Sequence, residues 1–278
     1  MKKKVIKGTY NMTKTYHFIS GLPRSGSTLL SAILKQNPSI YADISSPLCG
    51  MVSNCIGSMT GSENNLNINE TRRKDVLYGL IDGYYKSVDN PVIIDSNRTW
   101  AAKTNLLKSL YPTSKIICCV RDIPWILDSF ERIANKNSLY TNTFIEPEAN
   151  QCVTTRTDAL MDVQKGGQVI KPWFWLQEGY YANPEMILLV EYENLCKDPA
   201  NIMKLVYGFL GLEYFQHDFN NVDYSNENFD VPMGQPRLHT VKKRVEWKER
   251  KTILPPSVWK KYGGQEFWRA PKEMGAYE

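Results

Sequence analysis

The sequence lacks the features of a membrane protein, a secreted protein or a metalloprotein. No stretch approaches the roughly 20 apolar residues that cross a bilayer. The Lys-rich N-terminus is not followed by the apolar run of about 7–15 residues that a signal peptide needs. We therefore expect no membrane span and a cytoplasmic location. The six cysteines lack C-x-x-C spacing, and Cys118 and Cys119 lie in an apolar run, so we expect reduced, buried thiols and no metal.

Charge of one sign is also not in large excess. The formal net charge of +5 suits an anionic substrate or cofactor but is too small to indicate a nucleic-acid partner. Basic residues gather at 242–251, where Glu246 and Glu249 interrupt them. This run is either a binding surface or a solvated face. The length of 278 residues and 42% hydrophobic content predict a soluble globular chain that buries a sizeable core.

Residues 18–30 read Phe-Ile-Ser-Gly-Leu-Pro-Arg-Ser-Gly-Ser-Thr-Leu-Leu. The apolar start predicts a strand ending at Gly21, and the spacing after Ser27 predicts a helix. Backbone N–H groups and the helix dipole make such a strand, loop and helix an anion site. The glycine spacing and Thr28 match the phosphate-binding P-loop, but Ser27 replaces its lysine, which argues against nucleoside triphosphate hydrolysis. Arg24 offers a planar donor fork for an oxyanion instead. The alternative is a turn without a ligand.

Further short apolar runs predict three more strands, separated by segments with helical spacing. Four strands that alternate with helices predict a three-layer α/β/α sandwich around a mainly parallel sheet. Two polar stretches, 61–69 and 135–167, are predicted to be irregular. The predicted later strands are 91–95, 115–120 and 186–190. The predicted helices after the first are 71–86, 100–110, one with a core stripe of Ile126, Leu127, Phe130 and Ile133, 171–182 and 199–210, and a weaker final segment follows at 257–262.

Polar clusters follow two of these strands. Residues 95–98 read Asp-Ser-Asn-Arg, and Arg121 and Asp122 follow the next strand. The carboxyl ends of parallel strands form one ligand-binding edge, so these side chains should meet the anion loop. Arg121, with Ser129 about two helical turns later, supplies a guanidinium and a hydroxyl for a second phosphate. Since the P-loop lysine is missing, Asp122 is not expected to bind magnesium.

Taken together, these motifs resemble the PAPS-dependent sulfotransferase family. They follow the family's order across residues 16–211, and the tail resembles a bacterial and phage branch. We expect a single domain, 1–278, with its core at 16–211 and an irregular extension, 212–278, that folds over the site. The matching motifs are Leu22-Pro-Arg-Ser-Gly-Ser-Thr-Leu-Leu30 for the 5′-phosphosulfate loop, Cys119-Val-Arg-Asp122 with Ser129 for the 3′-phosphate motif, Val190-Glu-Tyr-Glu-Asn-Leu195 with Asp198-Pro199 and Phe209-Leu-Gly211 for the later signature, and Arg250-Lys-Thr-Ile-Leu-Pro-Pro256 with Phe267-Trp268 in the tail.

The resemblance implies a P-loop-NTPase-like sulfotransferase fold and an enzyme that moves the sulfuryl group of PAPS to an acceptor hydroxyl, leaving PAP and needing no metal. It also implies which residues bind the cofactor. The implied residues are Arg24, Ser25, Gly26, Ser27 and Thr28 for the 5′-phosphate and sulfuryl group, Arg121 and Ser129 for the 3′-phosphate, and Tyr192 near the adenosine.

The general base does not follow from the resemblance. Residues 95–97 stand where cytosolic members have Lys-Thr-His, and residues 43–46 contain no Glu where other members have a catalytic one. We rank Asp95 first because it ends a strand beside the cofactor, with a helix cap or an ion pair to Arg98 as its alternative role. His239 is second, in a Pro-rich basic region that could fold over the site, and Asp43 is third. Arg24 is the candidate that stabilises charge on the transferring group.

Two other functions stay open at this point. One is a P-loop kinase acting on a small molecule, and the other is a non-catalytic nucleotide-binding relative that has lost the base. The acceptor is also open: aromatic residues such as Trp100 and Trp175 would suit a phenol or sterol, whereas the polar stretches would suit a carbohydrate. The aromatic stripe of residues 171–182 is expected to belong mainly to the core. A homodimer is possible.

Overall fold

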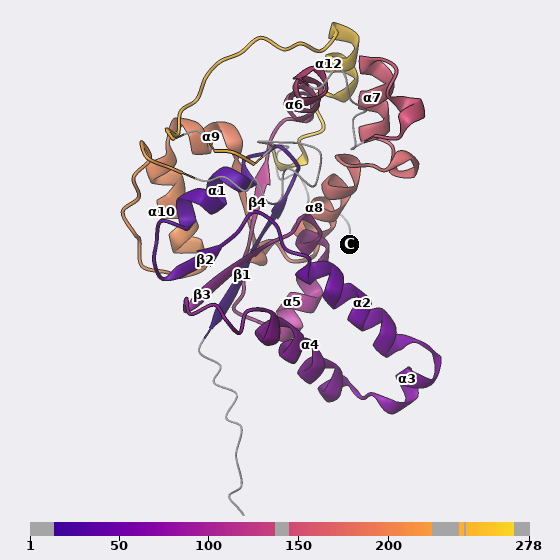
Figure 1. The fold of residues 1–278 in the computed structure, drawn as a ribbon, viewed down its shortest axis with the longest axis vertical. Coiled ribbons are helices and arrows are strands. Elements are labelled where there is room, and N and C mark those ends of the chain that lie inside the picture. Colours follow the sequence, from indigo (N-terminus) through magenta and orange to yellow (C-terminus); the bar gives the residue numbers. More distant parts are fainter. Residues whose placement is uncertain (1–13, 137–144, 224–238, 242, 270–278) are drawn as a thin grey trace, which may run out of the picture.

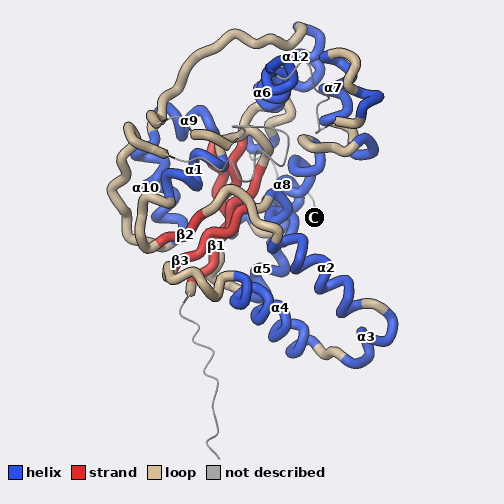
Figure 2. The backbone as a smooth tube through the Cα atoms, in the orientation of Figure 1, coloured by secondary structure: helices blue, strands red, loops and turns tan. Residues whose placement is uncertain are grey.

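The computed structural model describes residues 14–136, 145–223, 239–241 and 243–269 (Figure 1). Its centre is a five-stranded sheet in the order β2-β3-β1-β4-β5, and all four neighbouring pairs are parallel. Figure 2 shows the strands as one layer among helices. The strands are β1 (Thr15–Gly21), β2 (Ile40–Ala42), β3 (Val92–Ser96), β4 (Ile116–Val120) and β5 (Ile187–Glu191).

The strands are apolar because helices cover both faces of the sheet. Every residue of β3 and β4 is buried, as is typical of parallel strands, and Cys118 and Cys119 lie in this core as expected. Successive side chains point to opposite faces. Phe18, Ile93 and Cys118 join one hydrophobic cluster, whereas Ile19, Ile94 and Ile117 join the other.

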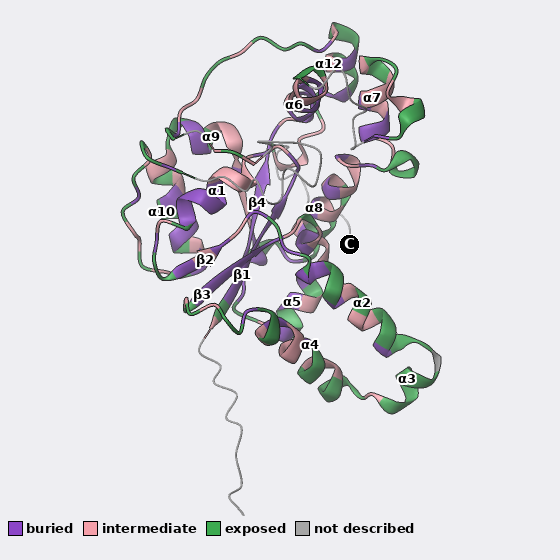
Figure 3. Ribbon diagram, viewed as in Figure 1, coloured by how far each residue is buried: buried purple, intermediate pink, exposed green. Residues whose placement is uncertain are grey.

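Two layers of helices enclose these clusters, which confirms the α/β/α sandwich. One layer contains α1 (Ser27–Leu34), α9 (Tyr192–Lys197) and α10 (Pro199–Leu210). The other contains α2 (Leu48–Thr60), α4 (Glu70–Tyr84), α5 (Thr104–Leu110), α6 (Ile123–Lys136), α7 (Val153–Leu160), α8 (Ile170–Ala182) and α12 (Pro256–Tyr262). Figure 3 shows the sheet buried and the outer surface of α2, α3 (Ser62–Asn67) and α4 mostly exposed, where they project from the sheet.

Several predicted boundaries were wrong. The strand β2 was not predicted, and the polar stretch 61–69 contains α3. The stretch 135–167 contains α7 and two 3-10 turns, η2 (Pro147–Ala149) and η3 (Val163–Lys165), although residues 137–144 lie outside the described part. The predicted helix 100–110 consists of η1 (Arg98–Lys103) followed by α5. The remaining short turns are η4 (Pro184–Met186) and η5 (Phe267–Arg269).

Two close backbone approaches set the geometry of the carboxyl edge of the sheet. A Cβ at Gly21, whose φ is 104°, would lie 2.2 Å from the carbonyl oxygen of Cys119, so the loop after β1 lies directly against β4. A Cβ at Gly179 would lie 2.0 Å from the carbonyl oxygen of Ala101, so α8 packs directly on η1. Among the described residues, none of the helices combines the length and apolar character needed to cross a membrane.

Candidate functional site

A cavity of about 1280 Å³ lies at the carboxyl edge of the sheet. Its walls come from the loop after β1, from η1, α6, α8 and α9, and from the chain between residues 239 and 253. Most of the predicted site residues meet there, although the sequence separates them by up to 215 positions, from Arg24 to His239. The predicted residues that line the cavity are Arg24, Gly26, Ser27, Thr28, Arg121, Ser129, Tyr192 and His239.

The anion loop is held by Ser25. Its hydroxyl oxygen lies 2.5 Å from the carbonyl oxygen of Leu22 and 2.8 Å from that of Cys119, so its one proton is shared between these two acceptors. The Ser25 side chain is therefore buried beneath the loop and lies outside the cavity wall, unlike the direct ligand that the resemblance implies. Gly26, with φ of 95°, is the N-cap of α1, so Ser27 and Thr28 occupy the first helical turn and line the cavity.

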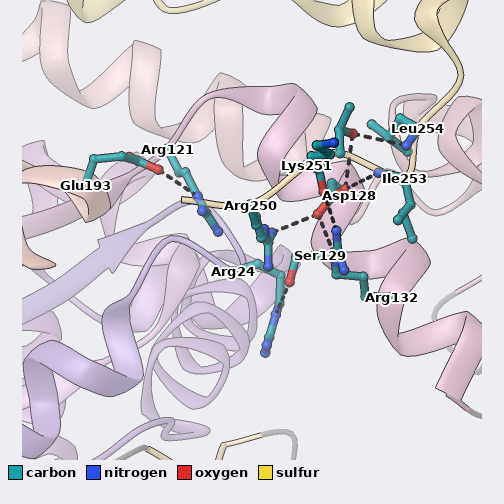
Figure 4. Close-up of polar contacts among 11 residues, drawn as sticks. Arg24, Arg121, Asp128, Ser129, Arg132, Glu193, Arg250, Lys251, Ile253 and Leu254 are labelled. Atoms are coloured by element: carbon teal, nitrogen blue, oxygen red, sulfur yellow. Dashed lines mark hydrogen bonds and ion pairs between the residues drawn. The ribbon is translucent and has the colours of Figure 1, made fainter. Parts of the chain in front are cut away.

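Arg24 connects the loop to α6. It has a φ of 56°, in the left-handed region that few non-glycine residues adopt. Its Nε donates a hydrogen bond of 3.2 Å to the hydroxyl oxygen of Ser129 (Figure 4). The two motifs that the sequence assigns to separate anionic groups are thus in direct contact inside one cavity.

Arg121 is fixed by two neighbours. It is only 6% exposed, and its Nε donates a hydrogen bond of 3.0 Å to Glu193 Oε1 (Figure 4). Its guanidinium carbon lies 4.4 Å from the ring centre of Tyr192, within the range of a cation–π contact. Tyr192 also packs against Gly26, where a Cβ would lie 2.7 Å from its Cδ2. Tyr192 and Arg121, to which the resemblance assigns the adenosine and the 3′-phosphate, therefore form one packed group beside the loop.

Asp128 is a buried residue that the sequence analysis missed. It accepts hydrogen bonds from Arg132 Nε at 2.8 Å, from the Ile253 N–H at 2.8 Å and from the Thr252 hydroxyl at 3.1 Å. Burial alone would raise its pKa, but these hydrogen bonds and the charges of Arg250 and Arg132 hold the pKa below its usual value. Asp128 is therefore a carboxylate that fastens the chain at 250–253 to α6.

This fastening places Arg250 on the cavity wall. Its Nη2 forms an ion pair with Asp128 Oδ2 at 2.8 Å, and Figure 4 shows it between Arg121 and Asp128. Two features of the sequence indicate Arg250: the basic run 242–251, which was equally compatible with a solvated face, and the tail motif 250–256, which begins at this residue. The fold shows that Arg250 belongs to a binding surface and not to a solvated face, because it lines the cavity and pairs with Asp128. The sequence could not show this contact, because 122 positions separate the two residues.

Arg98 supplies another cation. Its side chain opens into the cavity, and among the described residues no ion pair or side-chain hydrogen bond holds its guanidinium. Arg98 is exposed because the cavity is open, yet the cavity walls around it and the charge of Arg24 lower its pKa to about 10, so it remains protonated near neutral pH. The ion pair with Asp95 that the sequence suggested is not formed.

Asp95 lies beneath the cavity floor and does not line it. It is 1% exposed and accepts hydrogen bonds from the Ser46 hydroxyl, the Tyr85 hydroxyl and Trp100 Nε1. Burial raises its pKa despite these donors. The suggested helix-cap role falls to Asn97, which accepts from Thr99 N. This arrangement favours a role for Asp95 in stability over the role of general base.

The other carboxylates near the edge are also engaged. Asp43 Oδ1 accepts a hydrogen bond of 2.7 Å from Ile44 N, and Asp43 does not line the cavity. Asp122 forms an ion pair of 2.8 Å with Arg269. In the described part of the chain, no group of three His, Cys, Asp or Glu residues is arranged to hold a metal ion. Of the three candidate bases, His239 is the one on the cavity wall.

Comparison with known proteins gave a family match over residues 17–216, to a model described as the sulfotransferase family. None of the curated proteins matched the sequence. Similar solved structures include the sulfotransferase domain of an olefin synthase from Synechococcus PCC 7002, at 18% identity over 96% of this chain and 91% of that one, with a TM-score of 0.46. A sulfotransferase from Alicyclobacillus acidocaldarius is 17% identical over 79% and 92% of the two chains, with a TM-score of 0.47. A mouse sulfotransferase complexed with PAP is 16% identical over 72% and 60%, with a TM-score of 0.44.

Proposed function

Because this chain belongs to the sulfotransferase family, we propose that it takes the sulfuryl group from PAPS and transfers it to a hydroxyl of a small-molecule or carbohydrate acceptor. The family match supports sulfuryl transfer and does not favour the kinase or the non-catalytic relative. We extend the proposal to a single sulfotransferase domain, 1–278, in the cytoplasm. The chain after residue 211 supports it, since His239, Arg250 and their neighbours close one side of the cavity.

The observation that carries the PAPS proposal is the Arg24–Ser129 hydrogen bond. It joins two places that can each bind an anion, the loop after β1 and the first half of α6, in one cavity. The loop offers Arg24, Ser27 and Thr28 to the 5′-phosphosulfate. The second position offers Ser129 and Arg250 to the 3′-phosphate, with Arg121 beside them. When bound, PAPS supplies a sulfuryl group joined to a phosphate leaving group.

We place the adenosine of PAPS between the two anion positions and the segment after residue 243. Tyr192 and Trp247 both line the cavity, and their ring centres are 6.2 Å apart. Aromatic rings in this arrangement can pack against a purine. The ammonium group of Lys197 lies 5.3 Å from the ring centre of Trp247, and this cation–π contact helps to fix that ring.

Catalysis requires charge stabilisation and a base. We assign the first role to Arg24 and Arg98, because both are cationic and line the cavity near one another. We assign the second to His239, whose imidazole can take the proton of an acceptor hydroxyl. Asp95 remains outside this assignment, because three donors already occupy its carboxylate beneath the floor of the cavity.

Calorimetric titration tests the cofactor. PAP should bind without magnesium, at least about tenfold more tightly than the adenosine 5′-monophosphate that lacks the 3′-phosphate. Ser129→Ala should weaken PAP binding and leave the monophosphate unchanged. Lys204→Ala, an exposed position on α10 away from the cavity, is the matched control. A preference for ATP with magnesium would refute the proposal and support a kinase.

A further inference from the structure

The cavity contains more positive charge than its own carboxylates and a nucleotide can neutralise. Nine described arginine and lysine side chains line it, against one acidic side chain, Glu246. Glu246 forms an ion pair with Lys248. Two carboxylates behind the cavity wall also pair with arginines that line it: Asp128 with Arg132 and Arg250, and Glu193 with Arg121. These three carboxylates leave an excess of six positive charges. PAPS carries about four negative charges near neutral pH. About two positive charges therefore remain for another ligand.

Lys136 and Lys171 supply these two remaining positive charges, because both line the cavity away from the nucleotide end. Lys136 ends α6 and lies two helical turns, or about 10 Å along the axis, beyond Ser129. Lys171 is in the first turn of α8, which lies against η1 and so borders the cavity on the side of Arg98. In the described part of the chain, neither lysine forms an ion pair or a side-chain hydrogen bond. Tyr192 and Trp247, which mark the nucleotide end, come from other segments.

The face of α8 that carries Lys171 is suited to a ring as well as a charge. Lys171 and Trp175 are four residues apart, so both point to the same side of the helix and both line the cavity. Lys171 does not stabilise α8, because the helix dipole disfavours a cation in the first turn, and that turn contains no acidic residue. A bound anion would compensate for this charge.

We propose that the acceptor is itself anionic: a ring-bearing hydroxyl compound whose carboxylate or sulfate binds Lys171 and Lys136 while its ring packs against Trp175. This proposal rests on the proposed function, since the nucleotide must occupy the other cations. It narrows the acceptor from any phenol, sterol or carbohydrate to an acidic one. The acceptor hydroxyl then lies between the lysines and the loop, on the side of Arg98.

The test uses the PAP-loaded enzyme and two probes that share one ring and one hydroxyl, 6-hydroxy-2-naphthoate and its methyl ester. PAP binding is measured first, by calorimetry, and probe binding then follows from the fluorescence of the naphthalene ring. The acid should bind about tenfold more tightly than the ester, which corresponds to about 1.4 kcal/mol. Lys171→Gln should abolish most of this difference, whereas Lys204→Gln should retain it. Added salt should also reduce it.

The possible failures are distinguishable. If PAP itself does not bind, the proposed function fails together with the inference. If PAP binds but the acid has no advantage over the ester, or if neither probe binds, the anionic acceptor is refuted and the sulfotransferase proposal stands. An advantage of the acid that persists in Lys171→Gln and in Lys136→Gln would also refute the site, because other cations would then be responsible.

Discussion

Replacing Asp128 should weaken both the fold and the binding of the nucleotide. This carboxylate is fully buried, accepts three hydrogen bonds and pairs with Arg250. Removing one member of a buried ion pair costs about 3–5 kcal/mol. The arginine side chains paired with Asp128 are 34% exposed, so water would compensate in part for its loss. We therefore expect Asp128→Ala to lower the free energy of unfolding by about 2–3 kcal/mol.

The effect on function comes from Arg250, which only Asp128 holds by an ion pair in the described part of the chain. In Asp128→Asn, one acceptor oxygen remains but the charge is lost. PAP should then bind about tenfold more weakly, while adenosine 5′-monophosphate, which lacks the 3′-phosphate, should bind as before. Urea unfolding measures the first effect, and calorimetry at a temperature where the variant is folded measures the second.

Thr252→Val is the matched control for this prediction. It removes the hydrogen bond from Thr252 to Asp128 and the one that the Thr252 hydroxyl accepts from the Leu254 N–H, and it leaves the Arg250 ion pair in place. It should cost about 2 kcal/mol of stability and leave PAP binding nearly unchanged. If Asp128→Asn lowers stability but binds PAP as tightly as the parent protein, Asp128 is purely structural and the reasoning about Arg250 is refuted.

Two further predictions concern the histidines. Burial lowers the pKa of His17 and of His217 to about 4, so both are neutral in the folded protein while the unfolded chain titrates near 6.5. Stability should therefore fall as the pH drops from about 6.5 to 4, by roughly 2 kcal/mol per pH unit near pH 5 in urea unfolding. His217→Phe should about halve this slope, and a flat profile would contradict the assignment. His239→Gln should reduce kcat by about 10²–10⁴-fold and retain PAP affinity, whereas Asp95→Asn should lower stability and retain turnover. The reverse pattern would restore Asp95 as the base.

The sequence predicted β1, β3, β4 and β5 because strands inside a covered parallel sheet are apolar throughout. Such strands appear in the sequence as short apolar runs, and the polar residues that follow them mark the edge where the site forms. The strand β2 was missed because it has three residues and pairs only with β3. Its position at the edge of the sheet requires no long apolar run. The helix α3 was missed because six mostly polar residues show no periodicity, so only their place beside α2 and α4 explains them.

The site was harder to predict where it depends on the face that a residue occupies. Asp95 is the second-to-last residue of β3, at the expected edge, but it is two residues from Ile93 and so faces the core, beneath Trp100 and Tyr85. The alternation of side chains along the strand was the sequence signal that could have predicted this orientation of Asp95. The pair of Asp128 and Arg250 had no such signal, because 122 residues of chain must fold before the two meet.

The anion loop illustrates how a loop without the P-loop lysine can still position a cation. A left-handed backbone at Arg24 costs about 1–2 kcal/mol relative to glycine. The hydrogen bond that the buried Ser25 hydroxyl shares between two carbonyls can offset much of this cost, since one hydrogen bond contributes about 1 kcal/mol. Glycine at position 24 would relieve the strain but would remove the guanidinium that reaches Ser129. The loop thus retains a strained arginine because the Arg24 side chain connects the two anion positions through Ser129. A lysine at position 27 would extend from the first turn of α1 and would not make this connection.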